Sequence, residues 1–213
     1  MTSNHILYSF RRCPYAIRAR MGLAYCKISY EHREISLKKR PKSLYEISSK
    51  GTVPVLFTNN GTVIDESIDI MKWSLKKRDS KNWYVARKSE QDKMILRNDE
   101  DFKYMLDRYK YYTRYPEKAL SVYQKSIASM LYEYNLILKK TKYLINENLC
   151  LVDIVLMPFI RQCAYVDIDW FNNNFKHLSK WLDNLIRSKL FRSIMHKYDI
   201  WNPDFKGVLV KWK

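Results

Sequence analysis

The first part of the chain alternates short apolar runs with stretches in which apolar residues recur at helical spacing. Alternating apolar residues predict strands, and a recurrence every three or four residues predicts helices. Seven elements follow in the order strand, helix, strand, helix, strand, strand, helix, which indicates a small α/β unit with its own core. The expected strands cover residues 5–10, 30–35, 53–58 and 62–64, and the expected helices cover residues 14–27, 41–49 and 66–77.

The pattern changes after residue 78. Polar residues interrupt the periodicity over residues 79–88, which we interpret as a linker. From residue 89 onward the apolar positions follow helical spacing, and no strand pattern is convincing before the tail. We therefore expect an α/β domain over residues 1–78 and an all-α domain over residues 89–213. The helices expected in the second domain cover residues 89–114, 117–143, 151–165, 175–186 and 191–198.

The chain is strongly basic, with a formal net charge of +17 over 213 residues. Such a charge favours an anionic partner, which could be a nucleic acid, an acidic membrane surface or a small ligand. The lysines are spread over the whole chain, however, and there is no arginine-rich arm and no zinc-finger or RNP-like motif. This distribution indicates a general composition bias and argues against a nucleic-acid function.

The apolar runs and the cysteines indicate the cellular compartment. No apolar run approaches the roughly 20 residues that span a membrane, and no secretory leader is visible at the N-terminus. The four cysteines show neither metal-binding spacing nor a paired framework. We therefore expect a cytoplasmic protein without a membrane segment, a metal site or disulfides.

Cys13 stands between the first expected strand and the first expected helix. Pro14 follows it, and proline is favoured in the first turn of a helix. The thiol thus lies at a helix N-terminus, where unpaired N–H groups and the helix dipole favour negative charge, and Arg11 and Arg12 add positive charge. These conditions lower the pKa of a thiol. We predict a thiol pKa below the ordinary value of about 8.5; the alternative is a small, inert buried residue.

Three short motifs carry a family resemblance. They are Cys13-Pro14-Tyr15-Ala16, Thr52-Val53-Pro54-Val55-Leu56 and Asp65-Glu66-Ser67. In this order, and followed by a helical domain, they resemble the cytosolic glutathione transferase superfamily over essentially the whole chain. The omega-class transferases and the two-domain glutaredoxins, which use a cysteine, are the most similar members. The resemblance implies a thioredoxin-like α/β domain followed by an all-α bundle.

The resemblance also implies a site for glutathione as a co-substrate, without a permanently bound cofactor. In the family, the residue at Val53 offers its backbone to the cysteinyl part of glutathione, and we predict that the bond to Pro54 is cis. Ser67 would hold the γ-glutamyl carboxylate, Glu66 the amino group and Arg40 the glycine carboxylate. Judged alone, Ser67 is a helix cap and Arg40 belongs to a solvated charge run.

A cysteine nucleophile implies thiol transfer. Its thiolate forms a mixed disulfide with glutathione, and a second glutathione resolves it. Ala16 stands where dithiol glutaredoxins have their second cysteine, so the cycle is expected to be monothiol, with a disulfide or an electrophile as the acceptor. Two alternatives stay open. Tyr8 or Ser9 could activate glutathione for conjugation, or the protein could be a non-catalytic binding protein, like stringent starvation protein A or the chloride intracellular channel proteins.

We expect the acceptor to bind between the domains, where clefts form. The family also allows a homodimer. The alternative is that the candidate side chains only pack in the core or lie on the surface. The candidates are Tyr104, Arg108, Tyr111 and Tyr112 on the first long helix and Arg161 on the apolar one.

Cys150 and Asp153 open the most apolar helix of the second domain. Family members usually have serine or threonine at the position of Cys150, as part of a helix cap. Cysteine is a poor cap, but Asp153 can still reach the backbone N–H of Cys150. We expect this pair to serve folding, and we expect Cys150 and Cys163 to be inert core thiols.

Overall fold

The computed structural model describes residues 4–212. By its internal contacts the chain divides into two compact units. The first combines Met1–Ser80 with Lys189–Lys213, and the second is Lys81–Ser188. This grouping differs from the domain ranges expected from the sequence, because the C-terminal residues join the α/β unit rather than the helical one.

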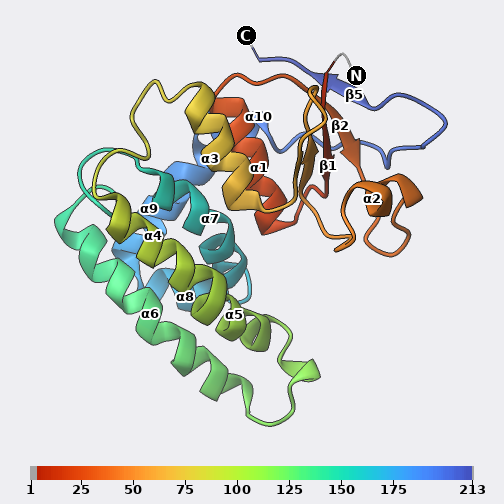
Figure 1. The fold of residues 1–213 in the computed structure, drawn as a ribbon. Helices are drawn as coiled ribbons and strands as arrows, with labels where there is room; N and C mark the ends of the chain where they lie inside the picture. Colours follow the sequence, from red (N-terminus) through yellow and green to blue (C-terminus); the bar gives the residue numbers. More distant parts are fainter. Residues whose placement is uncertain (1–3, 213) are drawn as a thin grey trace. The chain divides into compact units, whose positions relative to one another are not determined.

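The first unit is built on a mixed sheet with the strand order β4-β3-β1-β2-β5 (Figure 1). β1 runs parallel to β2, and the other neighbouring pairs are antiparallel. β5 lies in the tail, which the expected ranges assign to the all-α domain; it extends the sheet beyond β2. The strands are β1 (His5–Ser9), β2 (Tyr30–Glu34), β3 (Val55–Phe57), β4 (Val63–Ile64) and β5 (Val208–Val210).

Helices cover both faces of this sheet. On one face α1 packs against α3, and α2 lies on the other (Figure 1). Because successive side chains of a strand point to opposite faces, Leu7 joins the core under α1 and α3, whereas Ile6 and Tyr8 join the core that contains Leu44 of α2. The helices of this unit are α1 (Pro14–Tyr25), α2 (Lys42–Ile47), α3 (Ser67–Lys77) and α10 (Lys189–Ser193).

Gly22 permits a close approach of two helices. A Cβ atom at this position of α1 would lie 3.1 Å from Cγ of Met71 in α3. Along the chain, the elements up to this helix follow in the order β1-α1-β2-α2-β3-β4-α3. The thioredoxin-like fold expected for the first domain is thereby confirmed, and the predicted cis bond between Val53 and Pro54 is confirmed as well.

The second unit is helical, as expected. A π-helical turn over Asn98–Phe102 joins α4 to α5, so that a continuous helical stretch occupies most of the predicted helix at residues 89–114. A short 3₁₀ turn follows at Tyr112–Arg114, and α8 had no counterpart in the sequence pattern. The helices are α4 (Lys88–Arg97), α5 (Lys103–Lys110), α6 (Leu120–Lys140), α7 (Leu151–Ala164), α8 (Ile168–Asn174) and α9 (Lys176–Arg187).

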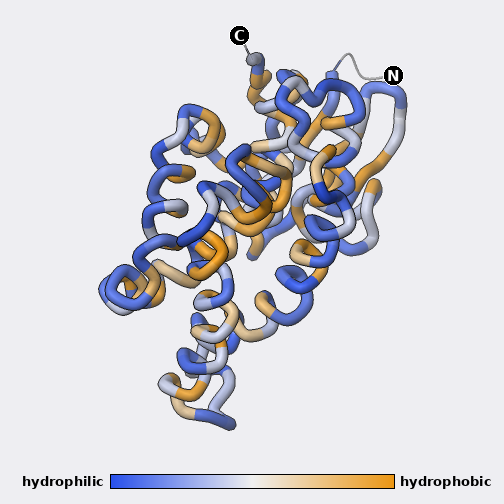
Figure 2. Tube along the Cα trace, turned by 90° about the vertical axis from the view of Figure 1, so that its left-hand side faces the viewer, coloured by the Kyte–Doolittle hydropathy of each residue, from blue (hydrophilic) through white to orange (hydrophobic). Residues whose placement is uncertain are grey.

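α7 forms the centre of the helical unit, and it contacts α4, α5, α8 and α9. Most of its side chains are buried. Figure 2 shows hydrophobic and hydrophilic residues alternating in short stretches along much of the tube, as expected when each element buries one face. Among the helices of residues 4–212, none combines the length and the apolar composition that crossing a membrane requires.

A buried carboxylate begins α7. Asp153 Oδ2 accepts a hydrogen bond from the backbone N–H of Cys150 at 2.9 Å, which confirms the expected contact. Its Oδ1 accepts from the backbone N–H of Leu144 and from Nε1–H of Trp181, both at 2.9 Å. Burial raises the pKa of Asp153 to about 6, against these three donors. The carboxylate therefore ties together three segments of the second unit.

Candidate active site

Cys13 is the N-cap residue of α1, and Pro14 takes the first helical position, as the sequence predicts. The backbone N–H of Cys13 donates to the carbonyl of Phe10 at 3.0 Å, which closes the turn after β1. Its Sγ donates to the carbonyl of Val53 at 3.6 Å. The turn therefore brings the thiol, which is partly exposed, to the backbone that precedes the cis proline.

Burial raises the pKa of the Cys13 thiol. The backbone N–H groups of Ala16 and Tyr15 and the charges of Arg20 and Arg18 lower this pKa, but desolvation outweighs them. For the protein without glutathione, the predicted thiol pKa below the ordinary value is therefore wrong. The helix start was predicted correctly. What sequence reasoning missed is that desolvation by the first unit outweighs the helix start, although the thiol stays partly exposed.

The hydroxyl groups of Tyr8 and Ser9 are engaged inside the first unit. Tyr8 Oη accepts from Arg33 Nη1 at 2.6 Å and donates to Ser43 Oγ at 3.0 Å. Ser9 Oγ accepts from Arg20 Nη1 at 2.6 Å. Both side chains are buried in β1. Each hydroxyl already has a strong partner, in contrast to the partly exposed cysteine.

Two predicted binding residues lie at the start of α3. Glu66 is the N-cap residue and Ser67 is the first helical residue. Ser67 is buried, and its Oγ accepts from Arg18 Nη1 at 3.5 Å. Glu66 is exposed, and its Oε1 accepts from Lys50 Nζ at 2.6 Å. Lys50 also donates to Oδ1 of Asp65 at 3.2 Å.

Sequence reasoning missed Arg18 and Lys50, and it quoted Asp65 only as part of a motif, without a role of its own. Asp65 accepts from the Ser48 hydroxyl at 2.8 Å, and this bond holds the pKa of its carboxyl below the usual value. A signal for Arg18 was present, because an arginine inside an otherwise apolar helix has to find buried partners. Nothing local in the sequence links Lys50 to Glu66, since their contact forms only when the loop before β3 packs beside α3.

Arg40 lies in the exposed loop before α2. Its Nη1 donates to Oη of Tyr45 at 3.4 Å. The structure joins Cys13 to Val53 and Arg18 to Ser67 by direct contacts, whereas the contact of Arg40 is made within its own segment. Its assignment to the glycine carboxylate therefore stays a prediction.

Four of the acceptor candidates lie in α5 or directly after it, in the second unit. The guanidinium carbon of Arg108 lies 3.4 Å from the ring centroid of Tyr104 and 4.6 Å from that of Tyr115. Tyr111 and Tyr112 follow directly and are exposed. Arg108, Tyr104 and Tyr115 form a basic and aromatic cluster.

The fifth acceptor candidate, Arg161, is half-buried near the end of α7. Its guanidinium carbon lies 5.0 Å from the ring centroid of Tyr165. α7 packs against α5 within the second unit. Whether any of the five candidates contacts an acceptor stays a prediction.

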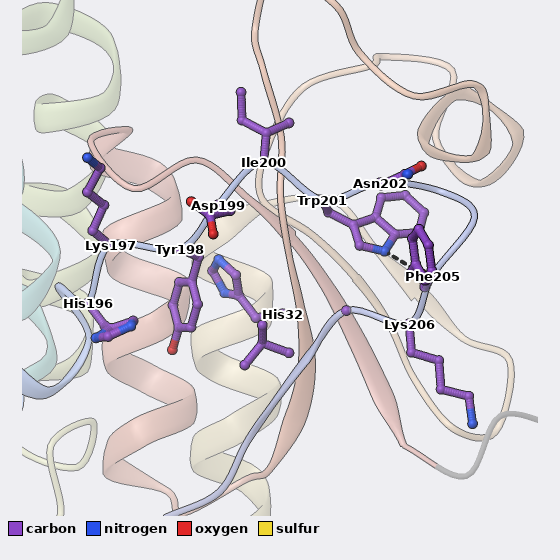
Figure 3. A pocket seen from close by; sticks show the side chains of 12 residues that line it. His32, His196, Lys197, Tyr198, Asp199, Ile200, Trp201, Asn202, Phe205 and Lys206 are labelled. Carbon is purple, nitrogen blue, oxygen red and sulfur yellow. Dashed lines mark hydrogen bonds between the residues drawn. The ribbon is translucent and has the colours of Figure 1, made fainter.

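A cavity of about 350 Å³ lies elsewhere in the first unit. It is lined by His32 of β2 and by residues 196–202 and 205–208 of the C-terminal tail, which we define as residues 194–212 (Figure 3). In residues 4–212, no group of three or more His, Cys, Asp or Glu side chains is arranged to hold a metal ion. The four cysteines all lie in this described part and are free thiols.

Family models match both parts of the chain. The model described as "Glutathione S-transferase, N-terminal domain" matches residues 7–83, and the one described as "Glutathione S-transferase, C-terminal domain" matches residues 101–189. Glutathione S-transferase omega-1 of Mus musculus is 39% identical over 62 residues, which are 29% of this chain and 26% of that protein. The matched stretch thus spans about a quarter of the relative's length.

Solved structures share the fold. The structure of a glutathione S-transferase I bound with lactoylglutathione superposes with a TM-score of 0.74 and 18% identity, over 91% of this chain and 99% of that one. A glutathione transferase from Phanerochaete chrysosporium, in complex with oxidized glutathione, gives a TM-score of 0.78 and 17% identity, over 90% and 94% of the two chains. At these identities the comparison concerns the fold alone.

Proposed function

Because the chain belongs to the cytosolic glutathione transferase superfamily, we propose that it is a monothiol glutathione-dependent thiol transferase with Cys13 as its nucleophile. Glutathione is the co-substrate, and the acceptor is a mixed disulfide or another reducible or electrophilic small molecule. One observation carries the proposal: the partly exposed thiol stands at the start of α1, 3.6 Å from the carbonyl of Val53.

The proposed reaction consists of two exchanges. The Cys13 thiolate attacks the glutathione sulfur of a mixed disulfide; the disulfide bond to the acceptor breaks, and the acceptor leaves as a thiol after taking a proton. A second glutathione, as its thiolate, then attacks the Cys13–glutathione disulfide. This step yields oxidised glutathione and restores the Cys13 thiolate, so the second glutathione supplies the electrons.

The surroundings of the thiol supply both binding and charge stabilisation. A peptide that pairs with the backbone of Val53, as an added strand does, would carry its own cysteine sulfur to Cys13. The N–H groups of Tyr15 and Ala16 favour the thiolate as it forms. Since burial raises the thiol pKa, the resting form is the thiol, and the reaction should accelerate as the pH rises.

The ends of glutathione are assigned to the three predicted residues. Ser67 stands at the N-terminus of α3, where backbone N–H groups favour a carboxylate. Glu66 would take the amino group, but it is already paired with Lys50 at 2.6 Å, so the ligand would have to share this carboxylate. Arg40, on its exposed loop, would reach the glycine carboxylate.

The conjugating alternative is less well supported. It requires the hydroxyl of Tyr8 or Ser9 to donate to the glutathione thiolate. Tyr8 already donates to Ser43 and accepts from Arg33, and Ser9 is fully buried. The non-catalytic alternative is a binding or regulatory protein on the same fold, without turnover. The acceptor candidates of the basic and aromatic cluster remain part of the thiol-transfer proposal.

Intact mass spectrometry after treatment with oxidised glutathione tests the proposal. We expect one glutathionyl group on the parent protein, removed again by excess glutathione, and no adduct on Cys13→Ser. Cys26→Ser is the matched control, because burial raises the pKa of Cys26 to about 12 and its loss should leave the adduct unchanged. An adduct that persists in Cys13→Ser refutes the proposal. Conjugation of an aryl halide that survives Cys13→Ser and disappears in Tyr8→Phe or Ser9→Ala would establish the alternative.

A further inference from the structure

The loop that leads from β1 to Cys13 is held on both sides of the same residue. The backbone N–H of Arg11 donates to Oε1 of Glu34, with an N···O distance of 2.6 Å. The backbone carbonyl of Arg11 accepts from Nη2 of Arg20, also at 2.6 Å. Glu34 and Arg20 are 6% and 1% exposed. Two short hydrogen bonds to ionisable side chains therefore hold the backbone on both sides of the Arg11 Cα atom, two residues before the nucleophile.

Arg20 connects this loop to the C-terminal tail. Its Nη1 donates to Oγ of Ser9 at 2.6 Å and to the carbonyl of Phe10 at 3.3 Å. Its Nε donates to the carbonyl of Ile194 at 3.2 Å. The carbonyl of Phe10 is the one that accepts from the N–H of Cys13. One buried guanidinium thus bridges the start of the tail and the turn that carries the thiol.

Glu34 makes the second connection. Its Oε2 lies 3.0 Å from Nε2 of His32, and the His32 ring stacks on Tyr198 of the tail with centroids 4.2 Å apart. The two rings lie beside each other in Figure 3. The backbone carbonyl of Glu34 also accepts from the N–H of Trp201 at 2.7 Å. The tail therefore contacts Glu34 both directly and through His32.

We propose that the C-terminal tail positions Cys13 through two positioning residues, Arg20 and Glu34. Neither residue takes part in the chemistry. Each contacts the tail on one side and holds the backbone of Arg11 by a hydrogen bond on the other. When the tail contacts are lost, the backbone of Arg11 becomes free to move, the loop before Cys13 opens and water reaches the thiol. Because desolvation is what holds the thiol back from ionising, such variants should ionise at lower pH and react faster.

The ionisable groups around Arg20 and Glu34 do not obscure a titration of the Cys13 thiol. Those that act electrostatically on Arg20 or His32 are Cys13, Tyr30, Glu34, His196 and Tyr198. Burial raises the pKa of Tyr30 and Tyr198 and lowers that of His32. Tyr30 and Tyr198 therefore ionise above their ordinary range and His32 below it, so that changes of the alkylation rate between about pH 7 and 9 report the thiol.

The test is the rate of alkylation by iodoacetamide as a function of pH, with Cys13→Ser as the blank. In Tyr198→Ala, which removes the ring that stacks on His32, we expect the midpoint to fall by about half a pH unit and the rate at pH 7.5 to rise roughly threefold. Phe205→Ala is the matched control. It removes an aromatic ring from the same tail, but this ring is 70% exposed, and the profile should stay parental.

A double-mutant cycle separates this role from general loosening. Glu34→Ala should shift the midpoint in the same direction, and adding Tyr198→Ala should change nothing further if the tail acts through Glu34. A parental profile in folded Tyr198→Ala, or fully additive shifts, overturns the proposal. If Tyr198→Ala does not fold, His32→Gln removes the same stack, and a parental profile there overturns it equally.

The inference rests on the proposed role of Cys13, but its readout needs no glutathione. A parent protein that forms no glutathionyl adduct would refute the proposed function. The alkylation profiles would still decide whether the tail positions the thiol.

Discussion

At the scale of single residues, Cys13 is subject to opposing influences. The N-terminus of α1 and two buried arginines favour its thiolate, while enclosure by the protein favours its thiol, and the second effect is the larger. A helix N-terminus therefore does not by itself make a cysteine reactive. The balance depends on how much water the surrounding loops admit to the sulfur.

We predict a late titration of Cys13 in the protein without glutathione. Because burial raises the thiol pKa, the midpoint of alkylation against pH should lie above the ordinary thiol value of about 8.5. The measurement is the iodoacetamide rate from pH 6 to about 10.5, the upper end being near the ordinary pKa of lysine, with Cys13→Ser subtracted. A midpoint below the ordinary value would show that the helix terminus and the arginines prevail after all.

We predict that Ser67→Ala weakens glutathione binding about tenfold to a hundredfold, because a charge-assisted hydrogen bond contributes about 1.5–3 kcal/mol. Calorimetry would measure the affinity. Ser74→Ala is the matched control in the same helix, since Ser74 is also buried but donates to the carbonyl of Ile70. Arg40→Ala should cause a smaller loss, because Arg40 is exposed and Lys38 or Lys39 can replace its charge.

Alkylation of Cys13 should be unaffected by the loss of the Ser67 hydroxyl. If Ser67→Ala binds glutathione as well as the parent does, the γ-glutamyl carboxylate is not held there. Ser67 would then act only at the start of α3, through its contact with Arg18.

At the scale of elements, the start of α7 shows how one side chain holds a helical unit together. Asp153 satisfies three N–H donors that come from its own helix start, from the segment before it and from α9. A buried donor without a partner costs about 1–3 kcal/mol. The acid is therefore retained for folding, although burial makes its ionisation unfavourable.

We predict that Asp153→Ala lowers the free energy of unfolding by at least about 3 kcal/mol, because three buried donors lose their acceptor. The measurement is urea denaturation followed by circular dichroism. The control is Asp183→Ala in α9, whose side chain is half exposed and pairs with Arg187 at 2.8 Å. Exposed pairs of this kind contribute less than about 1 kcal/mol, so equal losses in the two variants would contradict the role of Asp153.

At the scale of the whole molecule, the chain returns at its C-terminal end to the unit where it started. β5 pairs with β2 and so covers an edge that would otherwise present unpaired backbone groups. Gly207 is needed for this approach, because a Cβ atom there would lie 2.4 Å from the carbonyl oxygen of His32. The tail is thus an integral part of the thioredoxin-like unit.

We predict that deletion of residues 207–213 speeds amide hydrogen exchange in β2 and leaves exchange in α7 unchanged, since β5 supports only the first unit. Exchange measured by mass spectrometry on peptides from both elements tests this. Leu209→Ser serves as the control, because its side chain is 43% exposed and the backbone pairing can persist. Equal acceleration in both elements would mean that the tail stabilises the chain as a whole.

The sequence by itself determined the order of the elements and the change from an α/β to a helical pattern. Apolar periodicity is a property of neighbouring residues, and each element must bury one face whatever it packs against. The same holds for the local signal of Pro14 after Cys13, whereas the cis bond before Pro54 was expected from the family resemblance. Residues that contact their near neighbours in the chain could therefore be placed from local patterns alone.

Only the tertiary structure decided what surrounds the thiol. Cys13 donates a hydrogen bond to the carbonyl of Val53, Arg20 donates one to the carbonyl of Ile194, and His32 stacks on Tyr198. These partners lie far apart in the chain, and no periodicity records which distant segments meet. Desolvation depends on all such contacts together, so the direction in which the thiol pKa shifts could not be read from the helix start alone.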